Sequence, residues 1–449
     1  MHRDLTQGKI FGSLMRLALP IAGGQVMNMA YNLTDMFWLG RVSSDALAAS
    51  GAAGLFLWLS VGLMMIGRVG AEVGVSQARG RGDIADAYSF SRTAVYIAAV
   101  LGFMYGAFLL LLRVPLVGFF NFRDMSVAAD AATYAGIMAI GIPAMFIGSA
   151  IHGAFVASGN SRTPFFISSS GLILNMILTP IVVFPLGMGV FGAALSSVIS
   201  QYTVLIVSLL AIKRFKTRPF AEYEFFSDGW HSLRSGTANK IFRLTIPVCL
   251  ENTLWPLLTM VTTRFEVYFG EFALAMSRVG TQVESLSWLV GAGFGAALTA
   301  FVGQNFGAGK HDRISLGVKY ATFFLTAWGG LVTAILWFGG EIILAMFLPD
   351  FADQNDMREL FITYLRILAA CQIFANLEYV AANAFRGKGR TIPPSVSGIT
   401  SNLIRVPLAF FLSRTPLGVM GVWIAVSFTA GFRGVMVCIW YLLVYRKVR

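Results

Sequence analysis

Residues 14–39 read LMRLALPIAGGQVMNMAYNLTDMFWL, and only Arg16 and Asp35 among them carry a charge. About 20 apolar residues are enough for a helix to cross the roughly 30 Å of hydrocarbon in a bilayer. This stretch therefore predicts a membrane-spanning helix with a carboxylate inside its length. Pro20 removes one backbone hydrogen bond, which allows the helix to bend.

Eleven further apolar runs follow along the chain. With the first, the predicted spans are 14–39, 48–77, 90–113, 131–157, 163–186, 189–212, 239–268, 274–303, 317–341, 360–385, 392–413 and 418–445. The composition agrees with this interpretation, because 56% of the 449 residues are hydrophobic and 12% are charged. Soluble globular chains carry about 25% charged residues. The predicted fold class is an all-α integral membrane protein with twelve transmembrane helices.

The net charge of +12 does not indicate a nucleic-acid-binding protein. Lys and Arg cluster in short segments between apolar runs, with no basic face on a soluble unit. If the N-terminus is cytoplasmic, the inside segments hold more than three times as many Lys and Arg as the outside ones. The positive-inside rule then places both termini in the cytoplasm of a multi-pass protein of the cell (inner) membrane.

The sequence gives no indication of an enzyme. Cys249, Cys371 and Cys438 lie far apart in apolar stretches, so they form neither a disulfide framework nor a metal-ligand spacing. Neither a metalloprotease helix motif nor a nucleophile elbow occurs. We expect no cofactor other than a coupling ion.

The two halves of the chain repeat each other. A single shift along the chain superposes motifs at the same place in each set of six spans. The pairs are Arg16-Leu17-x-x-Pro20 with Arg243-Leu244-x-x-Pro247, Ala46-Leu47-Ala48 with Ala273-Leu274-Ala275, Gln77-x-x-Gly80-x-Gly82 with Gln304-x-x-Gly307-x-Gly309, and Asn175 and Pro180 with Asn402 and Pro407. A one-residue slip adds Gly159-x-x-Arg162-Thr163 with Gly387-x-x-Arg390-Thr391.

Because six spans are an even number, the repeats are parallel. We expect two pseudo-symmetric six-helix bundles: an N-lobe (1–212), a cytoplasmic linker loop (213–238) and a C-lobe (239–449). Rocking one bundle against the other would open a central cavity to alternate sides of the membrane.

These motifs, in this order, resemble the multidrug and toxic compound extrusion (MATE) transporters, in the NorM- and DinF-like branch of the MOP flippase superfamily. The resemblance covers nearly the whole chain. It rests on Pro20, the segment Asn32-Leu33-Thr34-Asp35 leading to Gly40-Arg41-Val42, and the repeated Gln-x-x-Gly-x-Gly and Gly-x-x-Arg-Thr motifs. It implies a V of two lobes and cation-driven export of organic, often cationic and amphipathic, compounds.

Polar residues recur along the first span. Gln25, Asn28, Asn32 and Asp35 are spaced by three, four and three residues, which places them on one helix face. Lipid cannot satisfy such a face, so we expect it to line the lobe interior. The resemblance assigns the N-lobe cation site to Asp35. The plainer alternative is a helix-end residue that hydrogen-bonds to a loop.

The fifth and sixth spans supply oxygen atoms for the same site. The resemblance places Asn175 and Ser197 at positions of N-lobe ligands, and Thr179 where some members carry a second carboxylate. One carboxylate, an amide and two hydroxyls can hold Na⁺, and a single carboxylate can equally carry H⁺. For Thr179 and Ser197, helix packing is an equal alternative.

The second half departs from the first, because Thr262 stands where the first half has Asp35. It offers Glu251, which the resemblance assigns to a C-lobe cation site. Asn376 and Glu378 lie near the position of that site's second carboxylate. Arg405 should pair with Glu251 or Glu378, and in the first case Glu251 would be a gate or a strut.

Other charged or titratable side chains in the spans have plainer interpretations. Arg68 and Glu72, four residues apart, can pair with each other. His152 reads as a satisfied interior histidine rather than a proton relay. The pair Arg278 and Glu284 has no assigned role.

Two functions remain open at this point. The first is a monomeric antiporter in the lipid membrane that exports small organic compounds in exchange for Na⁺ or H⁺. The alternative is a flippase for lipid-linked sugars or polysaccharides, which would favour a cationic cavity. Arg68 and Arg405 keep it open, whereas the polar face around Asp35 favours the antiporter.

Overall fold

The computed structural model describes residues 4–120, 122, 124–214, 236–348 and 354–446. Twelve helical segments in these ranges are long and apolar enough to cross a membrane. The first half forms α1 (Ile10–Val42), α2 (Ser44–Gly80), α3 (Ile84–Gly118), α4 (Met125–Ala157), α5 (Arg162–Val183) and α6 (Gly189–Arg214). The second half forms α8 (Gly236–Val267), α9 (Glu271–Gly307), α10 (His311–Phe338), α11 (Gly340–Phe347), α13 (Asn355–Ala369), α14 (Gln372–Gly387), α15 (Ile392–Ser413) and α16 (Val419–Arg446).

Each predicted span overlaps one of these segments, which confirms the all-α membrane fold. The tenth span is interrupted: α13 and α14 are separate helices that together cross as residues 355–387. The short helix α11 follows α10 and was not predicted.

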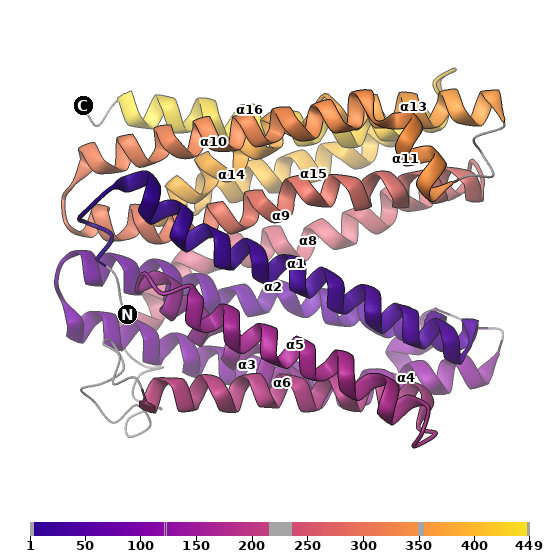
Figure 1. The fold of residues 1–449 in the computed structure, drawn as a ribbon, viewed down its shortest axis with the longest axis horizontal. Helices are drawn as coiled ribbons and strands as arrows, with labels where there is room; N and C mark the ends of the chain where they lie inside the picture. The colour runs from indigo at the N-terminus through magenta and orange to yellow at the C-terminus, as the bar shows by residue number, and fades with distance from the viewer. Residues whose placement is uncertain (1–3, 121, 123, 215–235, 349–353, 447–449) are drawn as a thin grey trace.

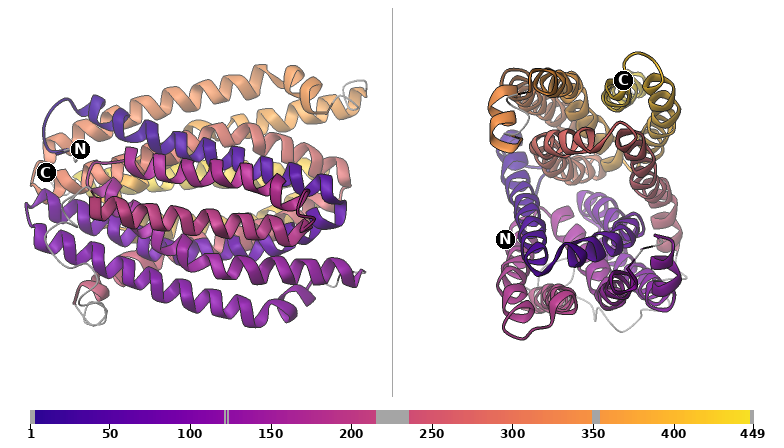
Figure 2. Two further views of the ribbon diagram at one scale, coloured as in Figure 1. Left: turned by 60° about the horizontal axis from the view of Figure 1, so that its bottom comes forward. Right: turned by 90° about the vertical axis from the view of Figure 1, so that its right-hand side faces the viewer.

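The helices run side by side along the long axis of the molecule (Figure 1). We call the end at which α1 begins and α16 finishes the terminal end, and the opposite one the far end. Helices of the first half gather on one side and most of the second half on the other, as the end-on view in Figure 2 shows. Between them, α1 packs on α9, and α2 packs on α8 and α9.

Polar side chains cap the starts of helices at the far end. The side chain of Ser43 accepts a hydrogen bond from the backbone N–H of Ala46 at the start of α2. The side chain of Asp124 accepts one from Ser126 at the start of α4. Such caps satisfy backbone donors that have no partner within the helix. The turn into α3 needs a left-handed residue, which Gly82 provides at φ +76°.

The helix boundaries refine the internal repeat. The starts of α2 and α3 fall on those of α9 and α10 under the shift that carries Gln77 onto Gln304, which we call the shorter shift. The starts of α5 and α6 fall on those of α15 and α16 only under a slightly longer shift, which carries Arg162 onto Ile392. We call it the longer shift, and its extra residues fall between α10 and α13.

The longer shift changes two of the expected matches. The expected match of Asn175 with Asn402 is wrong, because the helix starts make Asn175 correspond to Arg405. Likewise the expected match of Gly159 with Gly387 is wrong. The helix starts make Gly159 correspond to Gly389, and both of these glycines have a positive φ.

Two glutamines of the repeated motif join the halves at the terminal end. Gln77 at the end of α2 donates its Nε2 hydrogen to the carbonyl of Gly387 at 2.9 Å. Its repeat, Gln304 in α9, donates to the carbonyl of Ala157 at 2.7 Å. Ala157 and Gly387 end α4 and α14, so each half reaches the equivalent carbonyl of the other. The Gln-x-x-Gly-x-Gly motif thus closes the terminal end.

The glycines of that motif let the two helices touch. A Cβ atom at Gly80 would overlap the carbonyl of Gln304, and one at Gly307 would overlap the carbonyl of Gln77. The N-terminal segment adds a third connection, because Leu5 is buried among second-half residues. Its backbone N–H donates to Oε1 of Gln304 at 2.9 Å.

Candidate functional site

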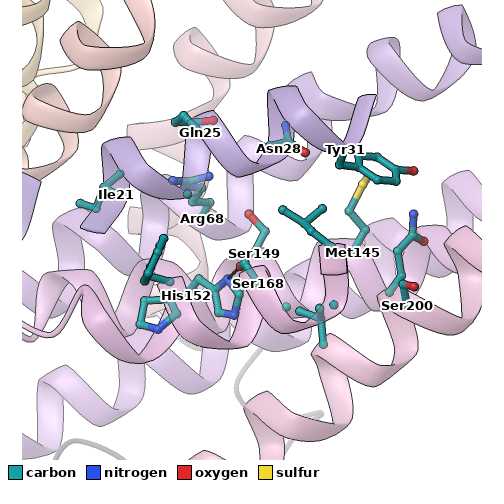
Figure 3. Close-up of a pocket in the computed structure, with 18 of the residues that line it drawn as sticks. Ile21, Gln25, Asn28, Tyr31, Arg68, Met145, Ser149, His152, Ser168 and Ser200 are labelled. Carbon is teal, nitrogen blue, oxygen red and sulfur yellow. Dashed lines mark hydrogen bonds between the residues drawn. The ribbon is translucent and has the colours of Figure 1, made fainter. Parts of the chain in front are cut away.

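A cavity of about 400 Å³ lies inside the first half of the molecule (Figure 3). Side chains of α1, α2, α4, α5 and α6 form its wall. Its volume is within the range of pockets for drug-sized ligands, roughly 300–1,000 Å³. Apolar side chains such as Met64, Met145 and Phe165 alternate in the wall with the polar Gln25 and Asn28.

A chain of hydrogen bonds lies on the side of the cavity toward the far end. The hydroxyl groups of Tyr31 and Ser197 are 3.0 Å apart. Nδ2 of Asn175 donates to Oγ of Ser197 at 3.1 Å, and the hydroxyl of Thr179 donates to Oδ1 of Asn175 at 3.2 Å. The structure thus brings together three predicted site residues from α5 and α6 and adds Tyr31 of α1.

Asp35 lies one turn beyond Tyr31 on α1. Its Oδ1 atom is buried and has no hydrogen-bond partner in the part of the chain that the structure describes. Its carboxylate interacts electrostatically with Tyr31 and with Tyr134 of α4. Asp35 therefore lies within the length of α1, next to the hydrogen-bonded chain. No ion pair within 4 Å joins its side chain to an arginine among the described residues.

The polar residues of α1 do not all face the cavity. Gln25 and Asn28 line the cavity, whereas Asn32 is exposed and lies outside the cavity wall. Tyr31 takes the place in the wall that Asn32 was expected to take.

His152 also lines the cavity. Its two ring nitrogens face the hydroxyl groups of Ser168 and Ser208 at 3.4 and 3.1 Å. Both nitrogens therefore have partners, in agreement with the expected satisfied interior histidine.

Glu251 is held by residues that the sequence did not suggest. Its Oε2 atom accepts a hydrogen bond from Ser395 at 3.0 Å and forms an ion pair with Arg386 at 3.4 Å. Arg405 instead donates its Nε hydrogen to Thr429 at 3.0 Å. Ser395 and Arg405 are about 15 Å apart along α15. Glu251 lies at the depth of Ser395, so the expected pairing with Arg405 is wrong.

The other candidates of the second half lie on two faces of α14. Asn376 donates to Oγ of Ser287 in α9 at 2.7 Å. Glu378 points toward α16 and pairs with Arg433 at 2.6 Å. Arg405 interacts electrostatically with Glu378, but no ion pair within 4 Å joins them among the described residues, so the expected direct pairing is not formed.

Arg405 has a second acidic neighbour. It also interacts electrostatically with Glu284 of α9. Glu284 in turn accepts a hydrogen bond from Gln372 of α14 at 3.1 Å. The guanidinium group thus belongs to a polar cluster within the second half.

The helix-based repeat shows how the two halves differ at the site. Arg405 stands where the first half has Asn175, while Tyr364 and Ser427 stand at the positions of Tyr134 and Ser197. A guanidinium group therefore occupies the place of the amide. A fixed positive charge repels a small cation, so this place in the second half is unsuited to a copy of the first-half site.

The ion pair of Glu378 and Arg433 gives a stability prediction. Its side chains are 13% and 21% exposed, and breaking a buried pair leaves an uncompensated charge. Glu378→Gln should lower the free energy of unfolding in detergent by about 3–5 kcal/mol. The matched control is Glu341→Gln, because Glu341 pairs with Arg358 at 2.7 Å with both side chains about half exposed. A melting temperature equal in the two variants would contradict this reading.

The comparison with protein families decides the identity of the fold. The MatE family model matches residues 20–181 and again residues 247–411. The chain belongs to the MatE family. The first residues of the two matches, 20 and 247, are related by the shorter shift, and the last, 181 and 411, by the longer one. The two MatE matches thus have the register that the helix boundaries require.

Relatives of this MatE chain match over nearly its full length. The "Probable multidrug resistance protein NorM" of Thermotoga maritima is 24% identical over 435 residues, which cover 96% of this chain and 91% of the relative. The structure "Crystal structure of MATE in the bent conformation" has a TM-score of 0.88 at 20% identity and covers 98% of this chain and 96% of that one. The "Outward-facing conformation of a multidrug resistance MATE family transporter of the MOP superfamily" has a TM-score of 0.86 at 20% identity, with 99% and 98% covered.

These findings settle the class of the protein. It is a multi-pass membrane protein and a secondary active transporter that extrudes compounds. Its family and relatives are transporters rather than enzymes, and MATE transporters are ion-coupled and handle small organic substrates. The flippase alternative is not favoured.

Proposed function

We propose that this MatE chain is an antiporter that exports amphipathic organic compounds in exchange for H⁺ or Na⁺, with Asp35 as the ion-binding residue. The observation that carries the proposal is the buried, unpartnered Oδ1 of Asp35 within a membrane-spanning helix. A carboxylate in the hydrocarbon region costs free energy and is a functional candidate by default. A bound proton or cation satisfies that oxygen.

The surroundings of Asp35 favour H⁺ over Na⁺. The oxygen or nitrogen atoms of Asn175, Thr179 and Ser197 already bond to one another. A sodium ion would have to reorient these groups to collect several oxygen ligands at Asp35, whereas a proton needs the carboxylate alone. Both ions remain arms of the test below.

The proposed cycle follows from the contacts between the halves. The glutamine bonds and glycine contacts close the terminal end, which we assign to the cytoplasm from the positions of Lys and Arg. Binding of the ion at Asp35 changes the packing of α1 against α5 and α6, which lowers the affinity of the cavity for the compound. Ion and compound thus compete through a coupling free energy between two sites. We assign the protein to the cell (inner) membrane as a monomer surrounded by lipid.

The test is uptake of a fluorescent amphipathic dye, rhodamine B, by inverted proteoliposomes with the two gradients imposed separately. We expect a pH gradient to drive uptake and a sodium gradient without a pH gradient to give much less. Equal uptake with a sodium gradient alone would show that Na⁺ is a coupling ion. Absence of uptake with either gradient, in vesicles that contain correctly folded protein, would overturn the proposal.

A further inference from the structure

The cavity carries a positive charge that the proposed ion site does not use. Arg68 of α2 lines it, about 18 Å along the helix axis from Gly80 at the terminal end. Figure 3 shows Arg68 and Gln25 of α1 as parts of the same cavity wall. Among the described residues of the wall, Arg68 is the one cation and none is acidic.

The expected pairing of Arg68 with Glu72 does not neutralise this group. No ion pair within 4 Å joins the two side chains in the described part of the chain. Glu72 interacts electrostatically with both Arg68 and Arg386, so its charge is shared. Glu72 is buried and contributes nothing to the cavity wall. The hydrogen-bond donors of Arg68 are thus available to a guest.

The cavity wall supplies further polar groups without partners. The hydroxyl groups of Ser149, Ser161 and Ser200 are buried and unpaired in the described structure. A guanidinium group presents donors in a planar fork that matches the two oxygens of a carboxylate. An arginine inside the hydrocarbon region costs free energy. A purely apolar or cationic guest would make no favourable interaction with its charge.

We propose that the cavity binds organic compounds that carry a carboxylate group, with Arg68 as the residue that recognises it. The apolar wall near Met64, Met145 and Phe165 holds the body of such a compound. Asp35 lies about 15 Å from Gln25 along α1, so the carboxylate end and the ion site stay apart. This inference rests on the proposed function only in taking the cavity as the compound site.

The test compares two dyes that differ in one group: rhodamine B, which has a free carboxylate, and its methyl ester. Binding to purified protein is measured by fluorescence anisotropy, with protein-free micelles as the blank. Arg68→Gln should lower the affinity of the protein for rhodamine B by about tenfold or more, because a hydrogen bond to a charged group is lost. Binding of the ester should change by less than about twofold.

Controls separate recognition from damage. Arg68→Lys keeps the charge but lacks the planar fork, so its affinity for rhodamine B should lie between those of the unmodified protein and Arg68→Gln. Arg366→Gln changes an exposed arginine of α13 in the same way and should leave both dyes unaffected. An equal loss for both dyes in Arg68→Gln, or no loss for either, would overturn the proposal.

A second measurement needs no variant. In the unmodified protein, benzoate should displace rhodamine B at a lower concentration than benzamide, its uncharged analogue, and the reverse order contradicts the role of Arg68. No gradient is used in either experiment. Failure here therefore leaves ion-coupled export untouched, and failure of export leaves the binding result intact.

Discussion

Replacing Asp35 by asparagine should reduce gradient-driven dye uptake to the level of protein-free vesicles. Asparagine has nearly the same shape but neither gains nor loses a proton, so the ion no longer biases the two states of the cycle. The free energy of unfolding should not fall, because the substitution removes a carboxylate whose buried Oδ1 lacks a partner among the described residues. Uptake and melting temperature are measured on the same preparation.

The matched control for this variant is Asp124→Asn. Asp124 is exposed and caps α4 at the far end, and asparagine is an equally good cap. Its uptake should equal that of the unmodified protein. Undiminished uptake in Asp35→Asn, with normal folding, would remove Asp35 from the mechanism.

The second large effect is expected at the terminal end. Replacing both Gln77 and Gln304 by leucine leaves the carbonyls of Gly387 and Ala157 without their donors. Each loss costs about 1–3 kcal/mol, so the closed form should lose population by about tenfold or more. We expect the terminal end to open and dye uptake to fall.

Spin labels report this opening directly. Ala85 and Asp312 are exposed residues at the starts of α3 and α10, one in each half and related by the shorter shift. In a background without the three natural cysteines, the distance between labels at these positions should lengthen in the double variant. Asn252→Leu is the control, because that amide donates to the carbonyl of Val248 within α8 and not to the other half. An unchanged distance distribution would show that the glutamines do not hold the halves together.

The sequence predicts the spans well because a membrane helix is decided by its own composition. Each apolar run needs only length and a lack of charge. The stop between α13 and α14 was not visible, since the residues 370 and 371 that separate them are apolar Ala and Cys.

The register of the repeat could be predicted only where the motifs are dense. Gln77 and Gln304 fix the shorter shift for the first spans of each half. The longer shift arises from the connection between α10 and α13, which has no counterpart motif in the first half. Asn175 and Asn402, two asparagines related by the shorter shift, then suggested a match that the helix starts do not allow.

The candidate site was predictable along one helix but not between helices. Helical spacing places Gln25, Asn28 and Asp35 together, and Tyr31 could have been found by the same rule, four residues before Asp35. Tyr134 could not, because its contact depends on how α4 is rotated.

The ion pairs of the second half were hidden for the same reason. Glu251 pairs with Arg386 and Glu378 with Arg433, and in each case the two residues come from different helices. A partner on another helix depends on the rotation and depth of both helices, which the spacing of residues along one helix does not report.

Asp35 should take up and release a cation inside the membrane, and infrared difference spectroscopy detects this event at the carboxyl group itself. Spectra of the purified protein are recorded as pH, or sodium at fixed pH, is changed, and those of Asp35→Asn are subtracted. We expect a carboxyl band that appears on acidification, or shifts with sodium, in the unmodified protein and is missing from the variant. Identical difference spectra for the two proteins would contradict it.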